Sequence, residues 1–282
     1  MIDPSDFFKK YPEFIEQDIR RFRGTGVRNS YYNVNPEFMT KRLSHILHQN
    51  SVQNRTILDV GSCIGTLGAW ALEFGASHYT GVEVQPNFAN ISKTLLSQYF
   101  PNKFNIIHKP IEDFQTTEKF DIVVAAGVMF GVVDVFALCA KLASFSKERI
   151  IIEGIHPYDG MRMLMPDITR EQRKKLLEES SIIRINDNMG MTVDHTPGNL
   201  LGISGSEVSI GALDIIFRRL GWEQTNLYRY TFKNFPEFYD CENSNRYLVE
   251  YEYTGSYVKE FYKEHNNPNN KINVWNGNST TQ

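Results

Sequence analysis

Residues 58–68, LDVGSCIGTLG, follow a short apolar run and lead into a helical pattern. Gly61 and Gly65 have no Cβ atom, so the backbone can turn sharply at both positions and approach a ligand closely. The first N–H groups of the following helix lack partners within that helix and attract an anion such as a carboxylate. Asp59, just before the turn, repels a pyrophosphate and favours a cationic group. The segment therefore predicts a site for a small ligand that carries a carboxylate and a positive charge.

A second acid, Glu83, follows Asp59 at a spacing that indicates nucleoside binding. Glu83 ends the next apolar run, in the segment GVEV, 24 residues after Asp59 and 18 after Gly65. This spacing is close to that of the acid that hydrogen-bonds ribose hydroxyls in nucleotide-binding folds. A carboxylate at a strand end is often only a solvated edge residue, but its register after the glycine turn favours binding of a nucleoside.

Three residues have the chemistry of a general base: His156, His195 and Glu153. Glu153 and His156 lie at the end of the fifth apolar run, where open α/β folds bind their ligands. His195 lies in the segment TVDHTPG, which places Asp194 beside it in the chain. A histidine with a near-neutral pKa is suited to remove a proton from a hydroxyl, although either histidine also fits a surface or structural role.

The elements that position these residues are strands alternating with helices. Between residues 55 and 155 the apolar runs are TILDV, HYTGVEV, FNIIH, FDIVVAA and RIIIEGI. Strands buried on both faces read as continuous apolar runs, so this pattern predicts a doubly wound, mostly parallel α/β sheet. Residues 222–230 and 246–253 resemble two further strands and predict an antiparallel pair at the sheet edge. The expected sheet has seven strands.

Five segments follow from these patterns. Residues 51–155 and 206–254 are expected to form the Rossmann-like core, with a helical N-terminal cap over residues 1–50. Residues 156–205 interrupt the alternation after the fifth strand and predict an insertion that forms the lid of an acceptor pocket. Residues 255–282 are rich in asparagine and poor in apolar residues, so they are expected to be poorly ordered.

Two capping boxes mark expected helix starts. Thr169 and Gln172 have the spacing of such a box and open a charged helix within the insertion. Ser204 and Glu207 have the same spacing and predict the start of the last core helix. Gly221 is expected to end that helix.

These segments together resemble the class I (Rossmann-like) S-adenosylmethionine-dependent methyltransferase family. Asp59, Gly61 and Gly65 match its motif (D/E)xGxGxG, in which Cys63 replaces the middle glycine. The resemblance covers about half of the chain. It implies a sheet whose last strand is reversed, S-adenosyl-L-methionine as the cofactor, and methyl transfer as the activity. Asp59 separates this family from nicotinamide-binding Rossmann proteins, in which an acid would repel the pyrophosphate.

The resemblance also implies roles for single residues. Glu83 would bind both ribose hydroxyls of the cofactor. In the segment HKPIEDF, Ile111 would pack on the adenine ring, and either Glu112 or Asp113 would accept a hydrogen bond from its amine. Ala126, at the end of the fourth strand in AAGVMF, would leave room near the transferred methyl group.

The class of methyl acceptor is inferred mainly from motifs that the sequence lacks. AAGVMF is neither the (N/D/S)PP(Y/F) motif of enzymes that methylate exocyclic amino groups nor a Pro-Cys nucleophile. A net charge of −3 provides no global attraction to nucleic acid or to an anionic membrane. A small-molecule or sugar acceptor, methylated at oxygen or nitrogen, is the favoured reading. The alternatives are a tRNA-modifying methyltransferase, a nicotinamide-dependent oxidoreductase and a non-catalytic cofactor-binding protein.

The cysteines, the N-terminal residues and the lengths of the apolar runs indicate the cellular compartment and whether a metal is bound. Cys63, Cys139 and Cys241 lie far apart and have no metal-ligand spacing, so no metal is expected and the thiols are expected to be reduced. No run of eighteen apolar residues occurs, and the N-terminus is acidic and aromatic. These features predict a cytoplasmic protein and leave its oligomeric state open.

Overall fold

The computed structural model describes residues 2–24, 35–129, 132, 134–155, 167–179, 181, 183–186, 205–229 and 246–255. Of the expected C-terminal tail, only Gly255 belongs to this part of the chain. None of its helices is long and apolar enough to cross a membrane. Within the same residues, no three His, Cys, Asp or Glu side chains are grouped as metal ligands would be.

A seven-stranded sheet forms the centre of the molecule, with the order β3-β2-β1-β4-β5-β9-β8. Strands β1 to β5 are parallel, and β9 runs antiparallel to both β5 and β8. The sheet therefore confirms the predicted doubly wound, mostly parallel architecture and the antiparallel pair at its edge. The strands are β1 (Thr56–Val60), β2 (His78–Glu83), β3 (Phe104–His108), β4 (Phe120–Ala126), β5 (Ser146–Ile155), β8 (Trp222–Arg229) and β9 (Arg246–Tyr253).

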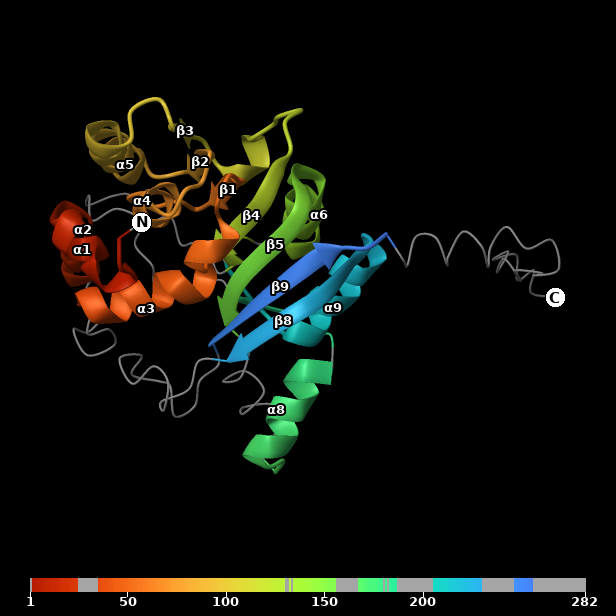
Figure 1. Cartoon of the computed structure of the whole chain (residues 1–282). Helices are drawn as coiled ribbons and strands as arrows, with labels where there is room; N and C mark the ends of the chain where they lie inside the picture. The colour runs from red at the N-terminus through yellow and green to blue at the C-terminus, as the bar shows by residue number, and fades with distance from the viewer. Residues whose placement is uncertain are drawn as a thin grey trace, which may run out of the picture.

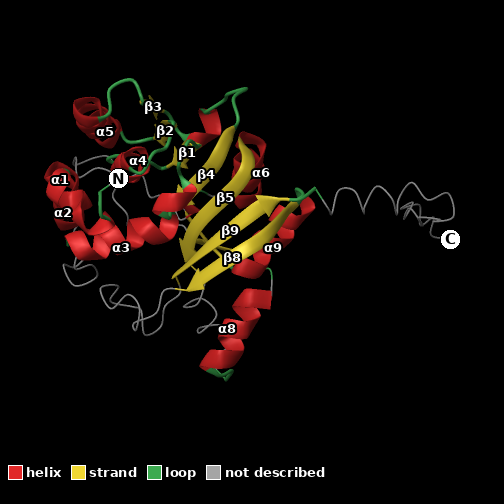
Figure 2. Cartoon of the chain, viewed as in Figure 1, coloured by secondary structure: helices red, strands yellow, loops and turns green. Residues whose placement is uncertain are grey.

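Helices cover both faces of this sheet (Figures 1 and 2). One face packs against α4 (Thr66–Glu73), α5 (Pro86–Tyr99) and the N-terminal helices, and the other against α6 (Val135–Phe145) and α9 (Ile210–Arg219). Because both faces are buried, the central strands need apolar side chains at successive positions, which is why TILDV and DIVVAA read as continuous apolar runs. The periodicity of the sequence thus follows directly from the three-layer arrangement.

The N-terminal helices pack on α4 and α5. They are η1 (Pro4–Asp6), α1 (Phe7–Lys10), α2 (Pro12–Gly24) and α3 (Pro36–Ile46), followed by η2 (Gln49–Ser51). The rings of Phe7 and Trp70 lie 5.2 Å apart, and Trp70 Nε1 donates to the carbonyl oxygen of Leu47 at 2.8 Å. Tyr99 of α5 donates to Glu13 of α2 at 2.6 Å. Aromatic packing and these hydrogen bonds join residues 2–24 and 35–51 to the same hydrophobic core as the sheet.

The capping box of the insertion is confirmed. Thr169 N–H donates to Gln172 Oε1 at 2.7 Å, and Gln172 N–H donates to Thr169 Oγ1 at 3.2 Å, at the start of α8 (Arg170–Glu179). Figure 1 shows α8 standing out beyond the sheet edge, below β8. The insertion also contains β6 (Ile183–Asn186), which pairs antiparallel with β7 (Gly205–Val208), the strand that starts at the last residue of the insertion.

The second predicted capping box is wrong. Ser204 lies outside the described residues, and Glu207 lies in β7, where its backbone pairs with β6 instead of starting a helix. The helix α9 begins at Ile210, and the side chain of Ser209 caps it by accepting from the N–H of Ala212 at 3.1 Å. Strand pairing with a distant segment overrode the local spacing. The predicted stop is confirmed, because Gly221 follows α9 with a left-handed φ of 88°.

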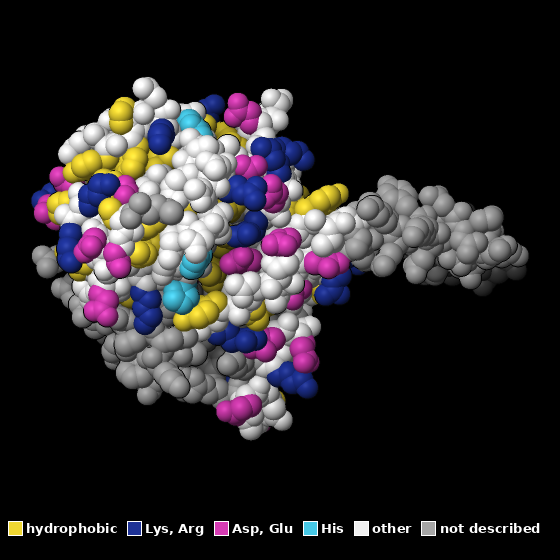
Figure 3. All heavy atoms as spheres, in the orientation of Figure 1, with side chains coloured by type: hydrophobic (Ala, Val, Ile, Leu, Met, Phe, Trp, Pro, Cys, Tyr) yellow, Lys and Arg dark blue, Asp and Glu magenta, His cyan; other side chains and the backbone are white. Residues whose placement is uncertain are grey.

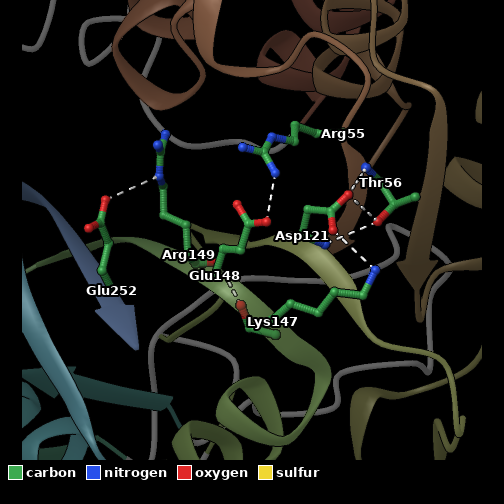
Figure 4. Close-up of polar contacts among 8 residues, drawn as sticks. Arg55, Thr56, Asp121, Lys147, Glu148, Arg149 and Glu252 are labelled. Carbon is green, nitrogen blue, oxygen red and sulfur yellow. Dashed lines mark hydrogen bonds and ion pairs between the residues drawn. The ribbon is translucent and has the colours of Figure 1, made fainter. Parts of the chain in front are cut away.

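Polar contacts join the amino-terminal ends of β1, β4 and β5, opposite the edge where the predicted site residues lie (Figure 4). Asp121 Oδ2 accepts from the N–H and the hydroxyl of Thr56 at 2.8 and 2.9 Å, and Lys147 pairs with Asp121 Oδ1 at 3.1 Å. Partial burial acts to raise the pKa of Asp121, but these hydrogen bonds and the charge of Lys147 lower it overall. Asp121 therefore holds three parallel strands together through its ionised form.

Asp121→Asn tests this contribution. Because Asn lacks the charge, we expect the free energy of unfolding near pH 7 to fall by about 1–2 kcal/mol. The folded pKa lies below the ordinary value of 3.8, so the stabilisation is present above that pH and is lost as the pH falls through the folded value. Urea titrations should therefore show a smaller difference near about pH 3 than near pH 7. An equal difference at both pH values, or the same loss in the exposed control Glu118→Gln, would contradict this role.

Candidate functional site

Three of the predicted acids lie buried at the carboxyl ends of parallel strands, on one face of the sheet. Asp59 lies in β1, Glu83 ends β2 and Glu153 lies near the end of β5, with 3%, 5% and 1% of their surfaces exposed. Asp59 contacts Tyr79 and Glu153 contacts Arg42 of α3, and Glu83 follows Tyr79 by four residues and so points to the same side of β2. The structure therefore gathers carboxylates from three strands on the face of the sheet that packs against α4, α5 and the N-terminal helices.

The glycine turn between β1 and α4 has a left-handed backbone at alternate residues. The φ angles of Gly61, Cys63 and Gly65 are 74°, 51° and 81°. A Cβ atom on Gly61 would lie 2.2 Å from Val128 Cγ2, and one on Gly65 would lie 2.3 Å from Ser92 Oγ. Both positions therefore require glycine for conformation and for space. Cys63, which replaces the middle glycine of the motif, keeps the left-handed conformation that glycine favours, so the shape of the turn is preserved.

Glu83 is anchored to this turn. Its Oε2 accepts from the N–H of Cys63 at 2.8 Å, and its Oε1 accepts from the N–H of Gln85 at 2.8 Å. A carboxylate oxygen has two lone pairs, so each can accept a further hydrogen bond from a ligand hydroxyl. The two backbone contacts fix the direction of the carboxylate, as an acceptor for a pair of neighbouring hydroxyls requires.

An apolar residue missed by the sequence reasoning follows Glu83. Val84 has 54% of its surface exposed, and His108 Nε2 contacts its carbonyl oxygen at 3.0 Å. Its exposed side chain offers a flat ring an apolar contact beside the acid. The available signal was that the apolar pattern of GVEV continues one residue past the acid at which the buried strand ends.

Asp59 is held by Tyr79, whose hydroxyl donates to Asp59 Oδ2 at 2.8 Å. The pKa of Asp59 is raised to about 7, mainly by burial and also by the charge of Glu83, while the Tyr79 hydrogen bond and the charge of Arg42 oppose the increase. Tyr79 fits only because Gly68 lacks a side chain, since a Cβ there would lie 2.4 Å from the ring. The sequence motif located Asp59 but did not reveal that Gly68 and Tyr79 position it.

The segment after β3 forms the short helix η3 (Ile111–Asp113). Ile111 is buried in the core on the α6 side of the sheet, whereas Glu112 and Asp113 are both exposed. Lys141 of α6 donates to the carbonyl oxygen of Glu112 at 2.5 Å and so fixes η3. The exposure of the two acids does not distinguish them as partners for an adenine amine.

The three predicted bases are in different situations. His156 and His195 lie outside the described residues. Glu153 is buried, and Arg42 contacts both of its oxygens: Nε donates to Oε1 at 3.1 Å, and Nη2 donates to Oε2. Protonating Glu153 would leave the charge of Arg42 without this partner in a low-dielectric region, which makes Glu153 a poor base. Arg42, 111 residues away in sequence, gave no local signal of this pairing.

The side chains and backbone of this site fit a nucleoside that carries a positive charge. The glycine turn leads into the N-terminus of α4, Glu83 offers anchored acceptors, and the three buried carboxylates of Asp59, Glu83 and Glu153 outweigh the charge of Arg42, which pairs with Glu153. Such surroundings favour a sulfonium or ammonium group and repel a pyrophosphate. The residues therefore suit S-adenosylmethionine better than a nicotinamide dinucleotide.

Comparisons with known proteins agree with this chemistry. Residues 58–148 match a family model described as a methyltransferase domain. No curated protein sequence matches the chain. A solved S-adenosylmethionine-dependent methyltransferase from Mesorhizobium loti has 14% sequence identity and a TM-score of 0.53, over 76% of this chain and 97% of that one.

Two further solved structures have a similar fold. Magnesium protoporphyrin IX methyltransferase from Synechocystis PCC 6803, solved with bound SAH, is 12% identical with a TM-score of 0.53, over 86% of this chain and 98% of that one. The 1,6-didemethyltoxoflavin-N1-methyltransferase of Burkholderia thailandensis is 15% identical with a TM-score of 0.52, over 90% and 92%. At these identities, the similarity establishes the fold alone.

Gly65→Ala tests the space at the turn. The added Cβ would meet Ser92 Oγ at 2.3 Å and Leu96 Cδ1 at 3.2 Å on α5, in addition to the left-handed φ. We expect the free energy of unfolding to fall by at least about 2 kcal/mol. Gly75→Ala is the matched control, because Gly75 has a φ of 97° but a Cβ there would have no neighbour nearer than 3.5 Å. Equal losses in urea unfolding of the two variants would mean that the contact with α5 is unimportant.

Asp59→Asn tests the buried charge. The pKa of Asp59 is about 7 when folded and 3.8 ordinarily, so the folded protein binds a proton more tightly and loses stability as the pH rises between these values. Asn keeps an acceptor for Tyr79 without the charge. We therefore expect the variant to gain roughly 2 kcal/mol over wild type between about pH 5 and pH 8 in urea unfolding. A stability difference that does not change with pH would show that Asp59 does not carry the buried charge.

Fold and sequence point to one family. The matched region contains the glycine turn, Glu83 and the strand that ends in Ala126. The seven-stranded sheet belongs to a fold that is shared with solved methyltransferases. Residues 58–148 therefore form a methyltransferase domain, in a chain that has the fold of solved class I, Rossmann-like S-adenosylmethionine-dependent methyltransferases.

Proposed function

We propose that this methyltransferase acts on an oxygen or nitrogen of a small-molecule or sugar acceptor, at the edge of the sheet where Asp59, Glu83 and Glu153 meet. The observation that carries the cofactor site is the anchoring of Glu83 to the glycine turn, through the N–H of Cys63 at 2.8 Å. This contact holds a carboxylate beside the turn that leads into the N-terminus of α4.

Each part of the cofactor has a proposed partner. Glu83 accepts from the ribose hydroxyls, and Gly61 and Gly65 let the backbone approach the methionine part. Asp59 faces its positive charge. The adenine packs between Ile111 and the exposed Val84, with Glu112 or Asp113 as acceptor for its amine. Ala126, at the end of β4, leaves room for the methyl group.

The bound cofactor supplies a methyl group on a sulfonium, which is transferred by in-line displacement. The protein's contribution is to hold the acceptor in line and, for a hydroxyl, to remove its proton. Glu153 is tied to Arg42, so His156 and His195, the latter beside Asp194, remain the proposed bases. Both lie at or in the insertion that begins at residue 156.

The insertion is the proposed acceptor lid. Its strand β6 pairs with β7. β7 lies next to the carboxyl end of β5, because the hydroxyl of Tyr247 donates to the carbonyl oxygen of Val208 at 2.8 Å and Tyr247 pairs with Gly154. A Cβ on Gly154 would lie 2.4 Å from that hydroxyl, so glycine is needed there. Residues of the insertion therefore begin beside the strand end where a methyl acceptor is expected in open α/β folds.

Charge and fold neighbours support a small acceptor. The chain has a net charge of −3, and basic and acidic side chains are interspersed on the face that Figure 3 shows. The Burkholderia thailandensis neighbour, a 1,6-didemethyltoxoflavin-N1-methyltransferase, was solved with bound 1,6-didemethyltoxoflavin. Methyl transfer to tRNA, accompanied by salt-sensitive RNA binding, would instead favour the tRNA-modifying alternative.

Glu83→Gln tests the cofactor site. Wild type should bind S-adenosylhomocysteine, and should be stabilised by it against heat, but not by NAD or NADP. Because a neutral amide accepts from hydroxyls more weakly than a carboxylate, we expect the dissociation constant to rise by about 10- to 100-fold in calorimetry.

The control for this variant is Glu118→Gln, which makes the same chemical change at an exposed position. It should bind S-adenosylhomocysteine as wild type does. Binding of a nicotinamide dinucleotide alone would support the oxidoreductase alternative. Binding of S-adenosylhomocysteine without transfer to any acceptor would support a non-catalytic protein.

A further inference from the structure

Arg42 joins the N-terminal helices to the carboxyl end of the sheet. Its guanidinium contacts both oxygens of Glu153, whose side chain is 1% exposed, whereas the Arg42 side chain is 19% exposed. The pair thus has a buried end on β5 and a more accessible end on α3. A guanidinium has five N–H donors in one plane, so it can bridge two carboxylates.

The charge of Arg42 also reaches Asp59, whose pKa it lowers against the effect of burial. Asp59 pairs in register with Val124 of β4, and Glu153 pairs with Ala126 of the same strand. Arg42 therefore interacts with acids on both strands that flank β4, which are β1 and β5. The strand β4 ends between them in the small side chain of Ala126. A cation therefore lies close enough to influence Asp59, the residue two positions before Gly61 of the glycine turn.

The first turn of α4 already has a carboxylate from the protein. Thr66 Oγ1 donates to Asp18 Oδ2 at 2.9 Å, and Asp18, from α2, is 2% exposed. An acid near a helix N-terminus is stabilised by the helix dipole. A ligand carboxylate that approaches the same turn consequently meets a like charge, and it needs a cation close by.

We propose that Arg42, oriented by Glu153, pairs with the carboxylate of the cofactor's methionine part, so that the N-terminal helices complete the cofactor site. Arg42 is then a binding residue and Glu153 a positioning residue that acts through it. This inference rests on the proposed cofactor site. It differs from the expectation that the N-terminus of α4 alone receives the carboxylate.

Two ligands separate this role from a purely structural one. S-adenosylhomocysteine carries the amino-acid carboxylate, whereas 5′-methylthioadenosine keeps the adenosine and the thioether but lacks that carboxylate. In calorimetric titrations of the full chain, Arg42→Met should weaken S-adenosylhomocysteine by at least about tenfold and leave 5′-methylthioadenosine within about threefold of wild type. Arg55→Met, which removes an arginine at the opposite edge of the sheet, should change neither affinity.

Arg42→Met leaves Glu153 buried without this partner and can impair folding. The double variant Arg42→Gln with Glu153→Gln removes both charges and should show the same selective loss. Glu153→Gln alone should also weaken S-adenosylhomocysteine selectively, because Arg42 loses its orientation. Equal weakening of both ligands, or no weakening of S-adenosylhomocysteine, overturns the proposal. A wild-type chain that binds neither ligand overturns the cofactor site itself.

Discussion

The hydrogen bond from the N–H of Cys63 to Glu83 ties the end of β2 to the turn between β1 and α4. This turn requires three residues with positive φ in close succession, and a side chain at Gly61 or Gly65 would collide with Val128 or with α5. Once the turn is formed, the direction of α4 is set. The position of Trp70 and Thr66 on α4 then determines where the N-terminal helices can pack.

Buried charge is the second constraint on this edge of the sheet. Asp59, Glu83 and Glu153 are all nearly inaccessible, and Arg42 compensates part of their charge. Burying carboxylates opposes folding unless they are hydrogen-bonded or paired. Each has a distinct partner: a tyrosine hydroxyl, two backbone N–H groups and a guanidinium. These buried carboxylates lower the stability of the folded chain, and they also provide an environment suited to a cationic ligand.

The N-terminal helices are therefore more than a cover. Asp18, an acid from α2, contacts the first turn of α4. Arg42, a cation from α3, contacts Glu153 near the end of β5. Apolar packing against Trp70 and the contact of Tyr99 with Glu13 hold these helices in place. Packing energy from aromatic side chains is thus used to position two charges that the parallel sheet does not itself provide.

The sequence alone determined the alternation of strands and helices, the glycine turn, the acid at the end of β2 and the two strand segments near the C-terminus, because each shows in the residue types of a short segment. Periodicity, positive φ and helix caps are local properties of the chain. Tertiary structure decided the remainder. Ser204 and Glu207 have the spacing of a helix cap, yet pairing with β6 places Glu207 in a strand. Glu153 has the chemistry of a base, yet Arg42, 111 residues distant, neutralises it. Contacts between segments far apart in sequence leave no periodic signal in either segment, so only the folded chain reveals them.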